Sequence, residues 1–182
     1  VSSKVTVLGN HCSKFIDSPY SRTGILEGNP IHKDMVAASK MAHQKYIVNV
    51  IIDADKKVVH AVAGDAIEAH AAGCKFLQDY CQVVPKKAAD IAISTNGGYP
   101  LDQNMYQSVK GMTAAEAAAK DDGILIMVSN CGDGHGGEGF YEALKNCSSP
   151  ADLMAEILKV PQDQTKPDQW EYQIQCRILM QH

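Results

Sequence analysis

Four polar side chains share one face of a helix expected after Pro100. At about 100° per residue, Gln103, Tyr106, Gln107 and Lys110 fall on the same side of this helix. An ammonium group supplies positive charge, and amide and phenol groups supply directed hydrogen bonds, so this face suits a small carboxylate. The alternative is an ordinary solvated face. The opposite stripe is predicted to face the core, and it consists of Leu101, Met105, Val109 and Met112.

Two glycine-rich loops follow expected strands. Residues 95–100 contain a Gly-Gly pair, and five glycines lie between Gly132 and Gly139. Backbone N–H groups of the second loop could cradle an anion, together with the start of the helix that follows. The loop lacks the lysine and the hydroxyl residue of a P-loop. His135 in this loop is a candidate proton carrier or ligand, and the alternative is a plain loop histidine.

Three further residues are weaker candidates. His11 follows an expected opening strand over residues 5–8. No partner lies at the spacing of a zinc site, so the residues alone favour a loop histidine, with metal ligation as the alternative. Arg22 is a candidate anion ligand, and His32 is expected to be solvated in the first turn of a helix. No Gly-x-Ser-x-Gly nucleophile motif is present.

An α/β framework is expected to position these residues. The predicted helix starts are Asn29-Pro30, Asp65 with Glu68, and Asp168 with Glu171, each with a capping residue. Strands are predicted over 46–52 and 57–62, as a hairpin, and over 90–94 and 123–128. Further helices are predicted over 100–119 and from near 139 and 150. Strands that alternate with helices indicate a parallel sheet, which binds ligands beyond the carboxyl ends of its strands.

Composition excludes several classes of protein. The 182 residues are 45% hydrophobic and 21% charged, which is typical of a globular chain with one large or two small domains. The net charge of -4 and the lack of a basic stripe argue against nucleic-acid or membrane-surface partners. No apolar run approaches the roughly 20 residues of a membrane span. The six cysteines form no Cys-x-x-Cys pair, which favours a reduced, cytoplasmic protein.

The charge balance changes near residue 87. Residues 1–87 carry eleven Lys or Arg and eight Asp or Glu, whereas residues 88–182 carry six and thirteen. The change coincides with a Val-Val-Pro-Lys-Lys break in the pattern, so we predict two domains, 1–87 and 88–182. The chain opens on Val1 without an initiator Met and stops directly after a helical pattern. We therefore expect a piece of a longer protein.

Several blocks of sequence resemble the lactate racemase family. They are Asn10-His11 and residues 21–35, 47–50, 63–65, 69–70, 95–102 and 106–112, and the resemblance extends from about residue 8 to about residue 145. Members of this family racemise or epimerise 2-hydroxy acids with a nickel-pincer nucleotide. The resemblance implies that a hydride leaves the hydroxyl-bearing carbon and returns to its opposite face, while two histidines act as acid and base.

The resemblance also implies roles for individual residues. His11 matches the family's nickel ligand and so becomes the cofactor-binding and metal residue, and imidazole nitrogen suits nickel. Tyr106, Gln107 and Lys110 match residues that face the substrate, and Lys110 would offset the charge of its carboxylate. The family's tethering lysine and both catalytic histidines lie upstream of Val1. No catalytic residue is therefore expected within this chain, and the chain alone is expected to be inactive.

The family fold is two α/β domains with the cofactor in the cleft between them. It implies that residues 1–87 are the C-terminal portion of the first, cofactor-binding domain, and that residues 88–182 are a truncated, Rossmann-like C-terminal domain. The implied partners are a small 2-hydroxy acid, such as lactate, and cofactor-synthesis proteins. Two alternatives are a non-catalytic domain that binds a small acid or nucleotide, and a Rossmann-like interaction domain without a cofactor.

Overall fold

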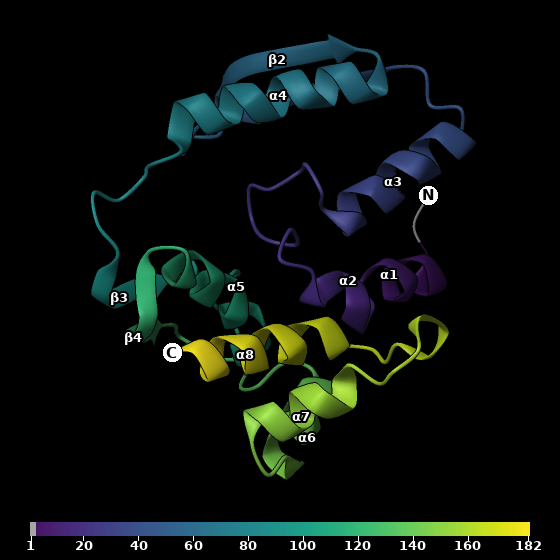
Figure 1. The fold of residues 1–182 in the computed structure, drawn as a ribbon. Helices are drawn as coiled ribbons and strands as arrows, with labels where there is room; N and C mark the ends of the chain where they lie inside the picture. The colour runs from purple at the N-terminus through teal and green to yellow at the C-terminus, as the bar shows by residue number, and fades with distance from the viewer. Residues whose placement is uncertain (1–2) are drawn as a thin grey trace. The chain divides into compact units, whose positions relative to one another are not determined.

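A computed structural model describes residues 3–182, and within them the chain forms two compact units (Figure 1). One unit consists of residues 24–84. The other combines residues 3–23 with residues 85–182. Sequence analysis grouped residues 1–87 together, whereas residues 3–23 pack in the unit of the C-terminal residues. Two hydrogen bonds show why: Ser13 Oγ donates to the Val160 carbonyl at 3.2 Å, and Gln173 Nε2 donates to the Ser13 carbonyl at 2.9 Å.

The unit of residues 24–84 is built on an antiparallel hairpin, as predicted. Its elements are α3 (Pro30–Met41), β1 (Ile47–Ile52), β2 (Val58–Gly64) and α4 (Ala66–Cys81). Ile47 lies opposite Gly64, and α4 packs against both strands. The two predicted helix starts are confirmed, because Asn29 Oδ1 accepts from the N–H of Ile31 at 3.0 Å and Asp65 Oδ1 accepts from that of Ile67 at 2.9 Å.

The second unit contains the predicted parallel strands. Its elements are α1 (Lys4–Asn10), α2 (Ser13–Asp17), β3 (Ala89–Thr95), α5 (Met105–Glu116), β4 (Ala119–Val128), α6 (Glu138–Asn146), α7 (Pro150–Ile157), the 3₁₀ turn η1 (Gln162–Gln164) and α8 (Gln169–Gln181). β3 and β4 run parallel, with Ile91 opposite Ile124 and Thr95 opposite Val128. The α/β class with a parallel sheet is thus confirmed, and α5 connects the two strands.

Helices α5 to α8 enclose the hydrophobic core of this unit. The core consists of Val109, Phe140, Leu153, Met154, Ile157, Tyr172 and Cys176. Val109 and Cys176 are fully buried, so α5 and α8 are fixed through this core. Among the helices of residues 3–182, none combines the length and the apolar character needed to cross a bilayer.

The strand predicted over residues 5–8 is wrong. These residues lie in helix α1, although Val5, Thr6 and Val7 are β-branched. Ser3 Oγ accepts a hydrogen bond from the N–H of Thr6 at 3.1 Å and caps the helix, and Gln162 Nε2 donates to the Gly9 carbonyl at 2.9 Å. Capping and contact with η1 therefore outweigh the β-propensity of the run.

Helix α5 starts later than predicted and turns a different side inward. Residues 98–102 form a turn, so the helix begins at Met105, with Asn104 as its cap. Of the predicted inner stripe, Val109 is buried, whereas Leu101 is 59% exposed and Met105 is 46% exposed. The inner side instead carries small residues such as Ser108 and Ala115. At Gly111 the helix comes so close to the sheet that a Cβ would lie 3.0 Å from the Thr95 carbonyl.

Candidate functional site

The polar face of α5 exists, but it is only partly solvated. Lys110 is exposed, and its Nζ donates to Gln107 Oε1 at 2.6 Å. Tyr106 is half-buried because its ring meets the Phe140 ring edge-on, with centroids 5.9 Å apart. The first turns of α5 thus bring together the three residues for which substrate contact was expected. Tyr106 also links this face to the core.

The Tyr106 hydroxyl is a hydrogen-bond donor at neutral pH. Burial, together with the negative charges of Glu171 and Asp168, raises the pKa of Tyr106 to about 12. A phenol with such a pKa keeps its proton throughout the physiological range. Tyr106 can therefore donate to an anion, next to the positive charge of Lys110.

Glu171 is a member of this cluster that sequence analysis did not place there. Its side chain on α8 is 3% exposed, although it was predicted to cap that helix. Burial raises the pKa of Glu171 to about 7, while the charge of Lys110 lowers it. The helical spacing of Glu171, Gln175 and Ile178 is the signal that could have identified it, since all three are buried on α8.

Asp168 fills the start of helix α6 and does not cap α8. Its backbone is left-handed, with φ of 64°, and its side chain makes no capping hydrogen bond with α8. A Cβ at Gly137 would lie 2.6 Å from Asp168 Oδ2, and a Cβ at Gly139 would lie 3.2 Å from the same atom. The predicted capping pair of residues 168 and 171 is therefore wrong. The Asp168 carboxylate instead lies beside Gly137 and Gly139 at the start of α6, where the helix dipole favours negative charge.

His135 packs against α6. Its ring stacks on Tyr141, with centroids 4.3 Å apart and planes 16° apart, and its Nδ1 is buried without a hydrogen-bond partner among residues 3–182. Its carbonyl accepts from the N–H of Tyr106 at 3.1 Å. His135 is thus bonded to α5 through its backbone carbonyl, while its ring stacks on α6.

His11 ends helix α1 and lies against Trp170 at the start of α8. The two ring centroids are 5.2 Å apart. His11 Nδ1 lies 3.1 Å from the Val7 carbonyl and 2.5 Å from Asn10 Oδ1, so this nitrogen carries the proton and Nε2 keeps its lone pair. Burial lowers the pKa of His11, although the bond to Val7 raises it. The ring is therefore a neutral imidazole, which is the form that binds metals.

Helix α8 links the two parts of the site, since Trp170 contacts His11 and the charge of the next residue, Glu171, acts on the pKa of Tyr106. Trp170 is the second site residue that sequence analysis missed. Residues 3–182 hold no group of three or more His, Cys, Asp or Glu side chains arranged for a metal ion. His11 is therefore a single candidate ligand.

The two remaining candidates are Arg22 and His32. Arg22 Nη1 donates to the carbonyls of Ser18 and Ser21, each at 3.0 Å, so this side chain braces its own loop. His32 stacks on His70 in the unit of residues 24–84, with centroids 5.5 Å apart.

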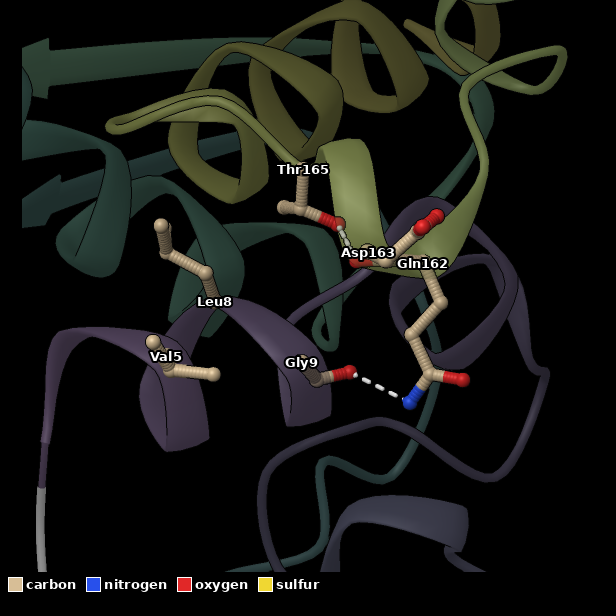
Figure 2. Close-up of a pocket in the computed structure, with 6 residues that line it drawn as sticks. All are labelled: Val5, Leu8, Gly9, Gln162, Asp163 and Thr165. Carbon is tan, nitrogen blue, oxygen red and sulfur yellow. Dashed lines mark hydrogen bonds between the residues drawn. The ribbon is translucent and has the colours of Figure 1, made fainter.

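A pocket of about 510 Å³ lies between α1 and η1 (Figure 2). It is lined by Val5, Leu8, Gly9, Gln162, Asp163 and Thr165. None of the residues predicted to bind substrate or metal lines it. The Gln162–Gly9 hydrogen bond crosses its edge. This pocket is therefore a feature of the α1 packing and separate from the polar face of α5.

The fold and site together define an α/β protein with a cationic, hydrogen-bonding helix face beside a neutral histidine. Comparison with known proteins gives the family. The family model described as lactate racemase C-terminal domain matches residues 84–182. The chain belongs to the lactate racemase family, which confirms the resemblance seen in the sequence.

Individual relatives match along the whole chain. It is 54% identical over 182 residues to a lactate racemase of Thermoanaerobacterium thermosaccharolyticum and 50% identical to one of Lactiplantibacillus plantarum. The solved lactate racemase apoprotein of the former organism aligns with 97% of the chain, at 56% identity and a TM-score of 0.93. The chain spans 42% and 43% of the length of the two relatives.

Proposed function

We propose that the protein carrying this chain interconverts the two configurations at the hydroxyl-bearing carbon of a 2-hydroxy acid such as lactate. The observation that supports the proposal is the α5 face, where Lys110, Gln107 and a protonated Tyr106 offer the positive charge and the hydrogen-bond donors that a carboxylate needs. The chain's relatives, named lactate racemases, supply the reaction class.

His11 fits the nickel-pincer nucleotide implied by the family. A metal-binding histidine commonly donates its other ring N–H to a carbonyl, and His11 Nδ1 does so to Val7. The remaining metal ligands would come from the nucleotide. When bound, the nucleotide would accept a hydride from the substrate carbon. Trp170, whose ring meets the His11 ring edge-on, would help to hold this imidazole in place.

The residues of α5 would bind and orient the substrate. Lys110 neutralises the carboxylate, Gln107 holds the ammonium group at 2.6 Å, and Tyr106 donates a directed hydrogen bond. Glu171 shares the positive charge of Lys110. When Glu171 is protonated, that charge is available to the substrate in full.

The test uses the full-length protein made together with its cofactor-synthesis proteins. We expect it to interconvert D- and L-lactate, or another 2-hydroxy acid, and to contain nickel near one equivalent by elemental analysis. His11→Ala should lose nickel and activity, because one donor of the metal is removed. Activity in a wild-type protein free of nickel would contradict the cofactor. Binding of the acid without interconversion would favour the non-catalytic alternative.

A further inference from the structure

We propose that Gly136 is a positioning residue for Tyr106, and that residues 131–137 form a template for the substrate-binding end of α5. This inference rests on the proposed function for its catalytic consequence. It assigns a role to the glycine-rich loop other than binding an anion.

Backbone hydrogen bonds join the loop to the first turn of α5. The N–H groups of Met105 and Tyr106 donate to the carbonyls of Gly134 and His135 at 3.0 and 3.1 Å. The first N–H groups of a helix have no partner within the helix, so the loop supplies the missing acceptors. Asp133 strengthens the junction, since its N–H donates to the Gln103 carbonyl at 2.7 Å.

Gly136 allows this close approach. Its φ is 84°, and a Cβ at this position would lie 2.7 Å from Asn104 Cγ and 2.9 Å from Tyr106 Cβ. Asn104 has little freedom to move away. It is 6% exposed, and its Oδ1 caps α5 by accepting from the N–H of Gln107 at 3.0 Å. A side chain at residue 136 must therefore displace the start of α5.

The displaced turn carries the substrate-binding residues. Tyr106 is held on the far side by Phe140, and Gln107 holds the Lys110 ammonium group. The loop has its own anchor, because the His135 ring stacks on Tyr141 of α6. The loop and α6 thus determine the positions from which Tyr106 and Lys110 would contact a ligand.

Gly136→Ala tests the proposal, with Gly24→Ala as the matched control. Both glycines have positive φ, 84° and 82°, so alanine strains the backbone at each. At Gly24, however, a Cβ meets no atom within 4 Å, and this residue lies outside the loop of residues 131–137. In the full-length, cofactor-loaded protein we expect Gly136→Ala to lower kcat/KM for the 2-hydroxy acid by about 10- to 100-fold, because the bound acid is misplaced. Gly24→Ala should stay within about threefold of wild type, with a similar loss of Tm.

Two further measurements test the positioning role of Gly136. Hydrogen exchange of the Met105 and Tyr106 amides should be slow in the wild-type protein, faster in Gly136→Ala and unchanged in Gly24→Ala. In a Tyr106→Phe background, Gly136→Ala should cost less than it does alone, because the hydroxyl that Gly136→Ala would misplace is already absent. Fast exchange in the wild type, or equal effects of the two alanines, would overturn the positioning role. Absence of turnover in a wild type with slow exchange would instead count against the proposed function.

Discussion

At the scale of residues, Lys110 is the side chain whose charge defines the candidate site. We expect Lys110→Ala to lower kcat/KM for the 2-hydroxy acid by about 10- to 1,000-fold, because the bound carboxylate loses its charge partner. Lys110→Arg should restore part of the loss at most, since guanidinium presents its donors in a fixed plane. Steady-state kinetics on the full-length protein measure both. Unchanged kinetics in Lys110→Ala would show that this face of α5 is an ordinary solvated surface.

Glu171 makes the stability of the protein depend on pH. Because burial raises its pKa from 4.5 to about 7, the folded protein holds the proton more tightly than the unfolded chain. The free energy of unfolding should therefore fall as pH rises from about 4.5 to about 7, by up to about 3 kcal/mol. Glu171→Gln should remove this fall in urea titrations at several pH values.

The exposed Glu156 on α7 provides the control for that experiment, since Glu156→Gln should leave the pH profile unchanged. An identical profile in wild type and Glu171→Gln would show that the carboxyl is not held in a buried, uncharged form.

Substrate binding should follow the same titration of Glu171. Above pH 7, ionised Glu171 draws on the charge of Lys110, so KM should rise there in the wild type and not in Glu171→Gln.

At the scale of elements, the contact of α5 with the parallel strands depends on Gly111. Replacing a glycine within a helix by alanine ordinarily increases the stability of the helix. A Cβ at Gly111, however, would lie 3.0 Å from the Thr95 carbonyl and 2.5 Å from Met127 Cε. We expect Gly111→Ala to destabilise the protein by about 1–3 kcal/mol in denaturant titrations, because the helix must move off the sheet.

Helix α1 offers the matched comparison for Gly111→Ala. Gly9 is also helical, and a Cβ there would come no closer than 4.0 Å to Gln162 Nε2. Gly9→Ala should therefore stabilise the protein by up to about 1 kcal/mol. Stabilisation by alanine at both positions would show that α5 does not approach Thr95 closely enough for a Cβ at residue 111 to clash.

At the scale of the whole molecule, the proposed metal site has one candidate protein ligand within the described residues. His11 is not joined there by two further His, Cys, Asp or Glu side chains in ligand geometry. Metal sites in proteins usually draw on at least three donors. Residues 1–182 expressed alone should therefore neither retain nickel through gel filtration nor interconvert a 2-hydroxy acid. Stoichiometric nickel on this polypeptide would show that it supplies donors beyond His11.

Local signals in the sequence determined much of this protein. Capping residues located the starts of α3 and α4, because Asn29 and Asp65 satisfy helical N–H groups two and three residues away. Alternation of strands and helices determined the parallel pairing of β3 with β4. Blocks of sequence determined the family, and helical spacing placed Tyr106, Gln107 and Lys110 on one face.

Contacts between distant segments decided the rest. Residues 5–8 became a helix because Ser3 caps them and Gln162 binds Gly9 from 153 positions away. The Asp168 carboxylate does not cap α8 and instead lies beside Gly137 and Gly139 at the start of α6, a placement that only the packing of these segments decides. Burial of Glu171 and the meeting of His11 with Trp170 likewise depend on how α8 packs on the segments before it. Helical spacing in the sequence determines which residues share a face of a helix. Which face is buried depends on the segments that pack against that helix, and these come from distant parts of the chain.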